Sequence, residues 1–388
     1  MAAVLLSFLV IFFAFEFLVK KLEIEDNKVK KLQQFLPFGF CILGIILLSV
    51  LLTGNNERNC DQYVEIDADI GGPGIRFAVW AQGIVLLAIA IIGTFHAKAT
   101  GIKEIGAGLA ITHFSLAIAL LVEMAKKQVK DGNVTQLNAA DAILGAMILD
   151  SQNVALSIPL VTKETLASRW QVCAMVFCQA FGLVLTGILV GNFGDGVFPI
   201  ELKQVKKPET CDSVRVVWWG LLSTPLSNSQ DEQYTSPEMA VFWVYFTFRW
   251  LLCLHSSFHA LFNMSIFHRA EKIGDPLKGI TFRRLLEDLS FYERLWKRMK
   301  FTTSDTIFQQ YPTTVSLMFV FYVVVSWGSL AAAEIALRRD FGDQPEHDFS
   351  VGQVIAVVVA GVTILRGLWL FSRMVQRDRR SIGWFYQI

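Results

Sequence analysis

The chain has 388 residues, of which 53% are hydrophobic, with a mean hydropathy of +0.46 and 31 phenylalanines. Long apolar runs alternate with short charged loops, a pattern typical of a polytopic membrane protein and not of a soluble domain. The net charge of +1 is divided between two membrane faces, so it identifies no partner. We expect a lipid bilayer as the surroundings, no nucleic acid partner and no cofactor.

Nine apolar runs are long enough to cross a bilayer as helices. The first run is closed by Lys20 and Lys21 and interrupted by Glu16, whereas a cleaved signal peptide carries its basic residues before the apolar run. We therefore predict an uncleaved first span and one all-α transmembrane bundle over residues 1–388. The predicted spans are Ala2–Val19, Phe35–Thr53, Phe77–Phe95, Ile105–Met124, Leu137–Val161, Trp170–Phe193, Met239–Phe262, Thr313–Ala333 and Val351–Phe371.

The distribution of lysine and arginine predicts the orientation of these spans. With a cytosolic C-terminus, the cytosolic segments carry 22 basic residues and the opposite loops carry 11, and Arg249 and Arg366 lie within spans. This bias predicts an external N-terminus and a cytosolic C-terminus. We expect an integral protein of the plasma membrane or of a secretory-pathway membrane.

Two further features agree with this orientation. Asn133 begins a glycosylation sequon in a predicted external loop, whereas the sequon at Asn263 falls at a cytosolic membrane edge and should be silent. Cys60 and Cys211 both fall in external loops, where a disulfide can persist, and the other four cysteines lie within spans. We predict a Cys60–Cys211 disulfide and a glycan on Asn133.

The external loop before the third span is acidic and then rich in glycine. Three glycines around a proline permit a tight turn or a close backbone approach. The segment could be a ligand-facing loop, a short re-entrant element or a plain turn, and its acidic residues could attract cations or simply be solvated. Its candidate residues are Asp67, Asp69, Gly71, Gly72, Gly74 and Arg76.

The fifth predicted span, Leu137–Val161, contains the most polar residues. A carboxylate facing lipid is costly, so Asp150 should face protein or water. Pro159 should kink or break the helix near Ala155. Helical spacing places Asp150, Asn153 and Ser157 on one face and places Asp141 and Gln152 on another. These residues could line a polar path, or they could only bond to neighbouring helices.

The seventh predicted span carries Arg249, His255 and His259. The two histidines are four residues apart and share a helix face, as metal ligands often do, but no HEXXH motif or second histidine pair accompanies them. We therefore predict no metal site. Packing against the Asp150 face or proton handling is the alternative, and Arg249 needs a carboxylate or water.

Two segments are expected at the cytosolic surface. Residues 265–311 contain leucines and basic residues at roughly helical spacing, which predicts an amphipathic helix on the inner leaflet, or a gate or docking element. Residues 372–388 form a basic, aromatic tail that suits an anchor at the same surface.

Two blocks of the sequence, Cys60–Gln82 and Asp150–Gln171, resemble a signature of fungal multi-pass membrane proteins without assigned activity. The first block contains the run DADIGGPGIR and the second contains DSQNVALSIPL. The resemblance covers about a third of the chain. It implies a multi-pass membrane fold and carries no chemistry.

Three classes of function remain open from the sequence. Polar, broken spans and an acidic external loop favour a channel or transporter for a small ion or solute, working as a homo-oligomer. A membrane-embedded enzyme would use Asp141, Asp150, His255 and His259 as acid–base groups, although no GxSxG or HEXXH motif is present. The third class is a membrane receptor or assembly subunit.

Overall fold

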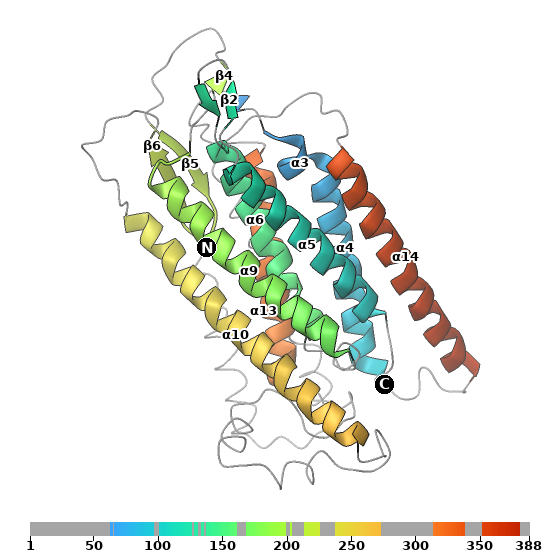
Figure 1. Ribbon diagram of the computed structural model, residues 1–388. Coiled ribbons are helices and arrows are strands. Elements are labelled where there is room, and N and C mark those ends of the chain that lie inside the picture. Colours follow the sequence, from blue (N-terminus) through green and yellow to red (C-terminus); the bar gives the residue numbers. More distant parts are fainter. Residues whose placement is uncertain are drawn as a thin grey trace.

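The computed structural model describes residues 63–64, 66–96, 101–125, 128–130, 133–135, 137–160, 168–198, 202–203, 213–225, 237–272, 313–337 and 351–380. Long helices run side by side through this part of the chain (Figure 1). The helices are α3 (Ala68–Gly71), α4 (Pro73–His96), α5 (Ile102–Ala125), α6 (Ala139–Ala155), α7 (Ser157–Leu160), α9 (Arg169–Gly194), α10 (Pro237–Lys272), α13 (Thr313–Ile335) and α14 (Val351–Arg380).

The helices coincide with seven of the predicted spans. Their ends differ from the predicted ends by four residues or fewer, except that α10 and α14 continue for ten and nine residues beyond. Within the described residues, five helices are long and apolar enough to cross a membrane, which indicates an integral membrane protein. The first two predicted spans, Ala2–Val19 and Phe35–Thr53, lie outside the described residues, so the number of spans and their orientation stay predictions.

The two segments expected at the cytosolic surface are described only in part. Residues 265–272 continue α10, and residues 372–380 continue α14, so both begin as extensions of long helices. The remainder of each segment lies outside the described residues. In α14, the guanidinium of Arg373 lies 4.4 Å from the ring centroid of Trp369, a cation–π contact.

Short strands accompany the helices. β1 (Tyr63–Val64) pairs antiparallel with β4 (Leu202–Lys203), and β2 (Gln128–Lys130) pairs with β3 (Asn133–Thr135). β5 (Ser213–Val217) and β6 (Leu221–Pro225) form a hairpin in which Val217 is opposite Leu221. All three pairs lie toward the end of the bundle where α4, α6, α10 and α14 begin, which we call the strand end (Figure 1).

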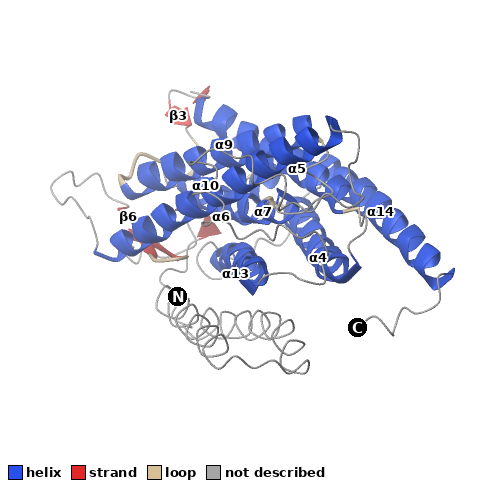
Figure 2. Cartoon of the chain, turned by 90° about the horizontal axis from the view of Figure 1, so that it is seen from below, coloured by secondary structure: helices blue, strands red, loops and turns tan. Residues whose placement is uncertain are grey.

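Helix α6 is the central element of the bundle. Every residue from Ala139 to Ala155 is buried. Helices α9 and α5 lie on one side of it, and α13 and α4 lie on the other (Figure 2). Because no face of α6 is left for lipid, its polar side chains must find partners on the surrounding helices.

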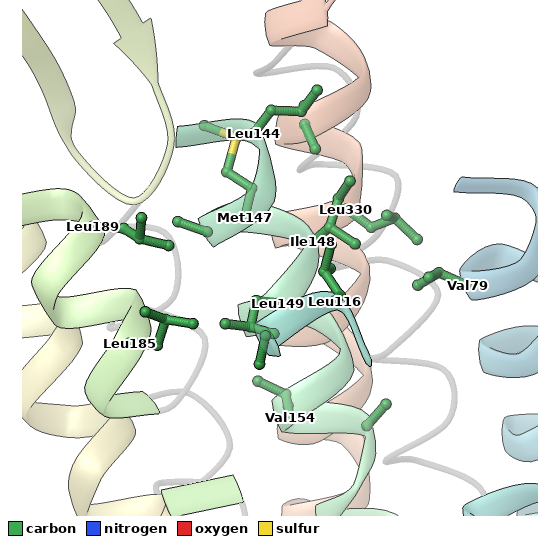
Figure 3. Close-up of a cluster of buried hydrophobic side chains, with 14 of the residues drawn as sticks. Val79, Leu116, Leu144, Met147, Ile148, Leu149, Val154, Leu185, Leu189 and Leu330 are labelled. Atoms are coloured by element: carbon green, nitrogen blue, oxygen red, sulfur yellow. The ribbon is translucent and has the colours of Figure 1, made fainter. Parts of the chain in front are cut away.

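Apolar side chains fill the space around the strand-end half of α6. Leu144, Met147 and Ile148 project from α6 in different directions toward residues of the neighbouring helices (Figure 3). Leu185 and Leu189 of α9 lie on one side of this cluster. Burial of such side chains removes about 25 cal/mol per Å² of apolar surface from water in a soluble protein, but in a bilayer close packing must hold the helices together.

The expected break of the fifth span is confirmed. Helix α6 ends at Ala155, Leu156 forms a turn, and α7 follows with Pro159 inside it. The Leu156 N–H still bonds to the carbonyl of Gln152 at 3.0 Å. Proline has no N–H to offer to the carbonyl of Ala155, so the helical ladder is interrupted there. A Cβ on Gly106 of α5 would lie 2.8 Å from Pro159 Cβ, so α5 packs closely on the break.

Candidate functional site

A buried ion pair lies at the centre of the bundle. Arg249 Nε of α10 donates to Asp150 Oδ1 of α6 at 2.8 Å, and each side chain is 1% exposed. Asp150 lies eleven residues after the start of α6, which is about 17 Å along the helix. The sequence predicted Arg249 or a histidine as the partner of Asp150, and the structure places Arg249 there.

The second oxygen of Asp150 accepts two further hydrogen bonds. Tyr245 Oη, one turn before Arg249 in α10, donates to Asp150 Oδ2 at 2.5 Å. Ser329 Oγ of α13 donates to the same oxygen at 2.8 Å. The carboxylate therefore has three donors from two helices, which offsets part of the large cost of burying a charge.

The polar contacts continue from Arg249 toward the helix break. Arg249 Nη2 donates to Asn153 Oδ1 at 2.9 Å. Gln179 of α9 then binds α6 three times, because Asn153 Nδ2 donates to its carbonyl at 2.6 Å and its Nε2 donates to the Asn153 carbonyl at 2.9 Å and to Ser157 Oγ at 2.8 Å. Ser256 of α10 lies 3.4 Å from both Ser157 Oγ and Gln179 Oε1.

We call this connected set the polar column. It extends along α6 from Asp150 to Ser157, about 10 Å at the helical rise. All its side chains are buried, and they come from three helices around one face of α6. The face predicted from helical spacing is therefore the face that carries these contacts. Its members are Asp150, Asn153, Ser157, Gln179, Arg249 and Ser256.

The tip of the β5–β6 hairpin meets the column on its strand-end side. Trp218 Nε1 and Trp219 Nε1 donate to Ser329 Oγ at 3.1 and 2.8 Å. Trp219 also stacks on Tyr245, with ring centroids 4.8 Å apart. Both tryptophans are 1% exposed. A stretch expected to be an external loop thus contributes a buried part of the site.

Gln152 and Ser151 face other neighbours. Gln152 lies beside His113 of α5, whose Nε2 donates to the carbonyl of Cys178 at 3.0 Å. Ser151 pairs with Ser326 of α13, with the two hydroxyl oxygens 3.2 Å apart. Neither residue belongs to the polar column, although both are buried. The structure thus separates Gln152 from Asp150, Asn153 and Ser157, as the helical spacing predicted.

Asp141 lies at the strand end, away from the column. Its Oδ1 accepts the backbone N–H of Asp67 at 2.8 Å. Nine residues separate it from Asp150, about 13 Å along α6. The two carboxylates therefore do not share a site, which removes one premise of the predicted acid–base enzyme.

The glycine-rich segment joins several helices at the strand end. Arg76 forms an ion pair with Glu334 of α13, and its Nε donates to the carbonyl of Gly71 at 3.0 Å. The Gly74 N–H donates to Gln353 Oε1 of α14 at 2.9 Å. A Cβ on Gly71 would lie 2.4 Å from Leu144 Cδ2, so this backbone packs directly on α6.

The acidic residues of this segment have local contacts. Asp67 is the N-cap of α3, because its side chain accepts the N–H of Asp69 at 2.8 Å. Gly72 is the C-cap of α3. A Cβ on Gly352 of α14 would lie 2.5 Å from Asp69 Oδ1, so this carboxylate packs against the start of α14. These contacts agree with a packed turn, one of the three alternatives for this segment.

Other predicted residues fall outside the described part. Cys60 and Cys211 are not described, and neither are the side chains of His255, His259 and Asn133. Among the residues that the structure describes, no group of histidine, cysteine, aspartate or glutamate could hold a metal ion.

Sequence reasoning missed half of the partners of the ion pair. Tyr245, Gln179 and Ser329 each lie in a predicted span, and Gln179 was detectable as an uncharged polar residue in an otherwise apolar run. Tyrosine and serine are ordinary in such spans, so Tyr245 and Ser329 gave no signal. Nothing in the sequence placed Trp218 and Trp219 at the same depth as Asp150.

Comparisons of the chain with protein-family models, with curated proteins and with solved structures find no match. The resemblance of two blocks to fungal multi-pass proteins stays a prediction.

Proposed function

We propose that the protein is a membrane channel or transporter for a small ion or solute, and that the polar column forms part of its path. The observation that carries this proposal is the buried Asp150–Arg249 pair in the middle of two helices. Ionisable residues at such depth are costly and rare, and they commonly mark ion or solute pathways.

The surroundings of the pair support the same proposal. The column continues to Ser157, next to the break at Leu156. Interrupted helices beside mid-membrane charges are typical of transporters, in which the interruption frees backbone groups to bind a solute. Because every member of the column belongs to one chain, the proposed path does not depend on a homo-oligomer.

The described conformation corresponds to a closed path under this proposal. Both charges are 1% exposed and are bonded to each other and to neutral groups. Passage of a solute requires the pair to separate or to become hydrated. Water weakens the attraction between unit charges from about 4 kcal/mol at an effective dielectric constant of 20 to about 1 kcal/mol at 4 Å.

The complete bonding of Asp150 also favours a second candidate. A receptor or assembly subunit would use the pair only to fix the register of α6, α10 and α13, since a buried pair can specify packing. The two candidates differ in what happens when both charges are removed together. An assembly subunit needs the packing alone, whereas a path needs the charges.

Reconstitution tests whether transport occurs at all. The full chain in liposomes should carry at least one of K⁺, Na⁺, H⁺ and Cl⁻, reported by trapped indicators, or a small neutral solute, reported by light scattering. The control is a protein-free liposome of the same lipid. No flux above this control for any of these species, from protein shown to be folded, would contradict the proposal.

A further inference from the structure

The β5–β6 hairpin is unusual because irregular backbone at its tip is buried inside the bundle. Its strands have five residues each, about 17 Å at the usual rise per residue. Val216, Trp218, Trp219 and Leu222 are at most 1% exposed, and the hairpin packs on α9 and α10. Non-helical backbone at membrane depth is tolerated only where it is enclosed by protein or lines a cavity.

Ser329 connects this tip to the ion pair. A serine hydroxyl has two acceptor lone pairs and one proton to donate. Here the lone pairs accept the N–H groups of Trp218 and Trp219, so the proton is directed to Asp150 Oδ2 at 2.8 Å. The hydrogen-bonding capacity of Ser329 is therefore fully used, and its direction is fixed by the two indoles.

Aromatic contacts hold the same arrangement. Trp219 stacks on Tyr245, which donates to Asp150, and the ring centroid of Trp218 lies 5.1 Å from that of Phe242. Each tryptophan at the tip thus contacts a residue of α10, and both reach Asp150 through one intermediate. Displacement of the tip would remove donors from the site and leave the space of two indoles beside Asp150.

We propose that the β5–β6 hairpin is a gate at the strand end of the polar column, latched to Asp150 through Ser329. With the tip inserted, Asp150 is held on Arg249 and shielded from the strand-end side. With the tip withdrawn, water reaches Asp150, and separation of the pair costs less. This gate rests on the proposed path, but its movement can be measured without any flux.

Thiol labelling measures the movement of the tip. Ala333 of α13 is fully buried one turn beyond Ser329 toward the strand end, on the same face of the helix. Ala333→Cys is therefore a small reporter beside the proposed gate. The reagent is a membrane-impermeant methanethiosulfonate applied to each side of proteoliposomes in turn. Peptide mass mapping locates the label, so the native cysteines can remain.

The latch is weakened by Trp218→Phe with Trp219→Phe, which removes both indole donors and keeps aromatic packing, and separately by Ser329→Ala. Loss of one buried hydrogen bond is worth about tenfold in an equilibrium. We expect Ala333→Cys to be labelled about tenfold faster or more in either variant, from the strand-end side only. Ser326→Ala is the matched control, because Ser326 lies one turn away on α13 and bonds to Ser151 instead.

Buried Cys178 of α9 reports general unfolding in the same map. Faster labelling of residue 333 with Cys178 still protected supports the gate. An unchanged labelling rate in both latch variants overturns it, and so does an equal increase in Ser326→Ala. Faster labelling without flux in any assay leaves the movement of the hairpin in place and contradicts only the proposed transport.

Discussion

At Asp150, one carboxylate accepts hydrogen bonds from a guanidinium, a phenol and a hydroxyl, and Arg249 in turn donates to Asn153. Removal of one charge from such a buried pair is worse than removal of both, because the remaining charge keeps its desolvation cost and loses its partner.

Asp150→Asn should therefore destabilise the protein by about 3–5 kcal/mol, since Arg249 is left without a counter-charge. The double variant Asp150→Asn/Arg249→Gln should recover a large part of this loss, because two neutral amides can still bond to each other. Thermal unfolding in detergent of wild type, both single variants and the double variant gives the coupling. Additive effects of the two single changes would show that the pair is not formed in the membrane protein.

Close packing against His113 gives a second prediction at the residue scale. A Cβ on Gly182 of α9 would lie 2.1 Å from His113 Nε2, whereas a Cβ on Gly191 of the same helix meets nothing within 4 Å. Gly182→Ala should destabilise the protein by about 1–3 kcal/mol, as overpacking does. Gly191→Ala should be neutral or slightly stabilising. Equal unfolding temperatures of the two variants in detergent would contradict the packing described for α5 and α9.

At the scale of elements, apolar run length was a sufficient signal for the long helices, because a bilayer requires about 20 apolar residues per crossing. The break at Leu156 was predictable from Pro159, and the polar face of α6 was predictable from its 3.6-residue period. The partners of that face were not, because which helices surround α6 depends on long-range packing. The β5–β6 hairpin was missed since Ser213–Pro225 is too short for a span and its depth leaves no mark in its composition.

The pairing of β1 with β4 bears on the predicted disulfide. Tyr63 is opposite Lys203, so the chain three residues after Cys60 lies beside the chain eight residues before Cys211. This supports the prediction that the two cysteines are bonded. Peptide mapping under non-reducing conditions should recover a Cys60–Cys211 cross-link from protein made in a secretory pathway. Recovery of both residues as free thiols would remove the support that they give to the topology.

At the scale of the whole molecule, the three strand pairs gather at one end of the bundle, which the charge bias predicts to be external. Asn133 belongs to β3 at this end, whereas Asn263 lies within α10, 26 residues from its start. Protein from a eukaryotic secretory pathway should carry a glycan that endoglycosidase removes and that Asn133→Gln abolishes. Asn263→Gln should leave the mobility on a gel unchanged. A glycan on Asn263 would reverse the predicted orientation of α10.

The central claim is that the Asp150–Arg249 pair lies on a transport path and is more than a packing contact. A second ion pair, Arg76–Glu334, joins α4 to α13 at the strand end and lies outside the polar column. Neutralising each pair in turn therefore separates loss of the path from loss of an ion pair in general.

The most direct test compares flux through liposomes that contain wild type, Asp150→Asn/Arg249→Gln or Arg76→Gln/Glu334→Gln, each shown to be folded by size-exclusion chromatography. We predict that neutralising the central pair changes the flux of the transported species about tenfold or more, which corresponds to about 1.4 kcal/mol in the barrier. We predict that the Arg76→Gln/Glu334→Gln protein keeps a flux close to that of wild type. Wild-type flux through a folded protein without the central charges would contradict the claim.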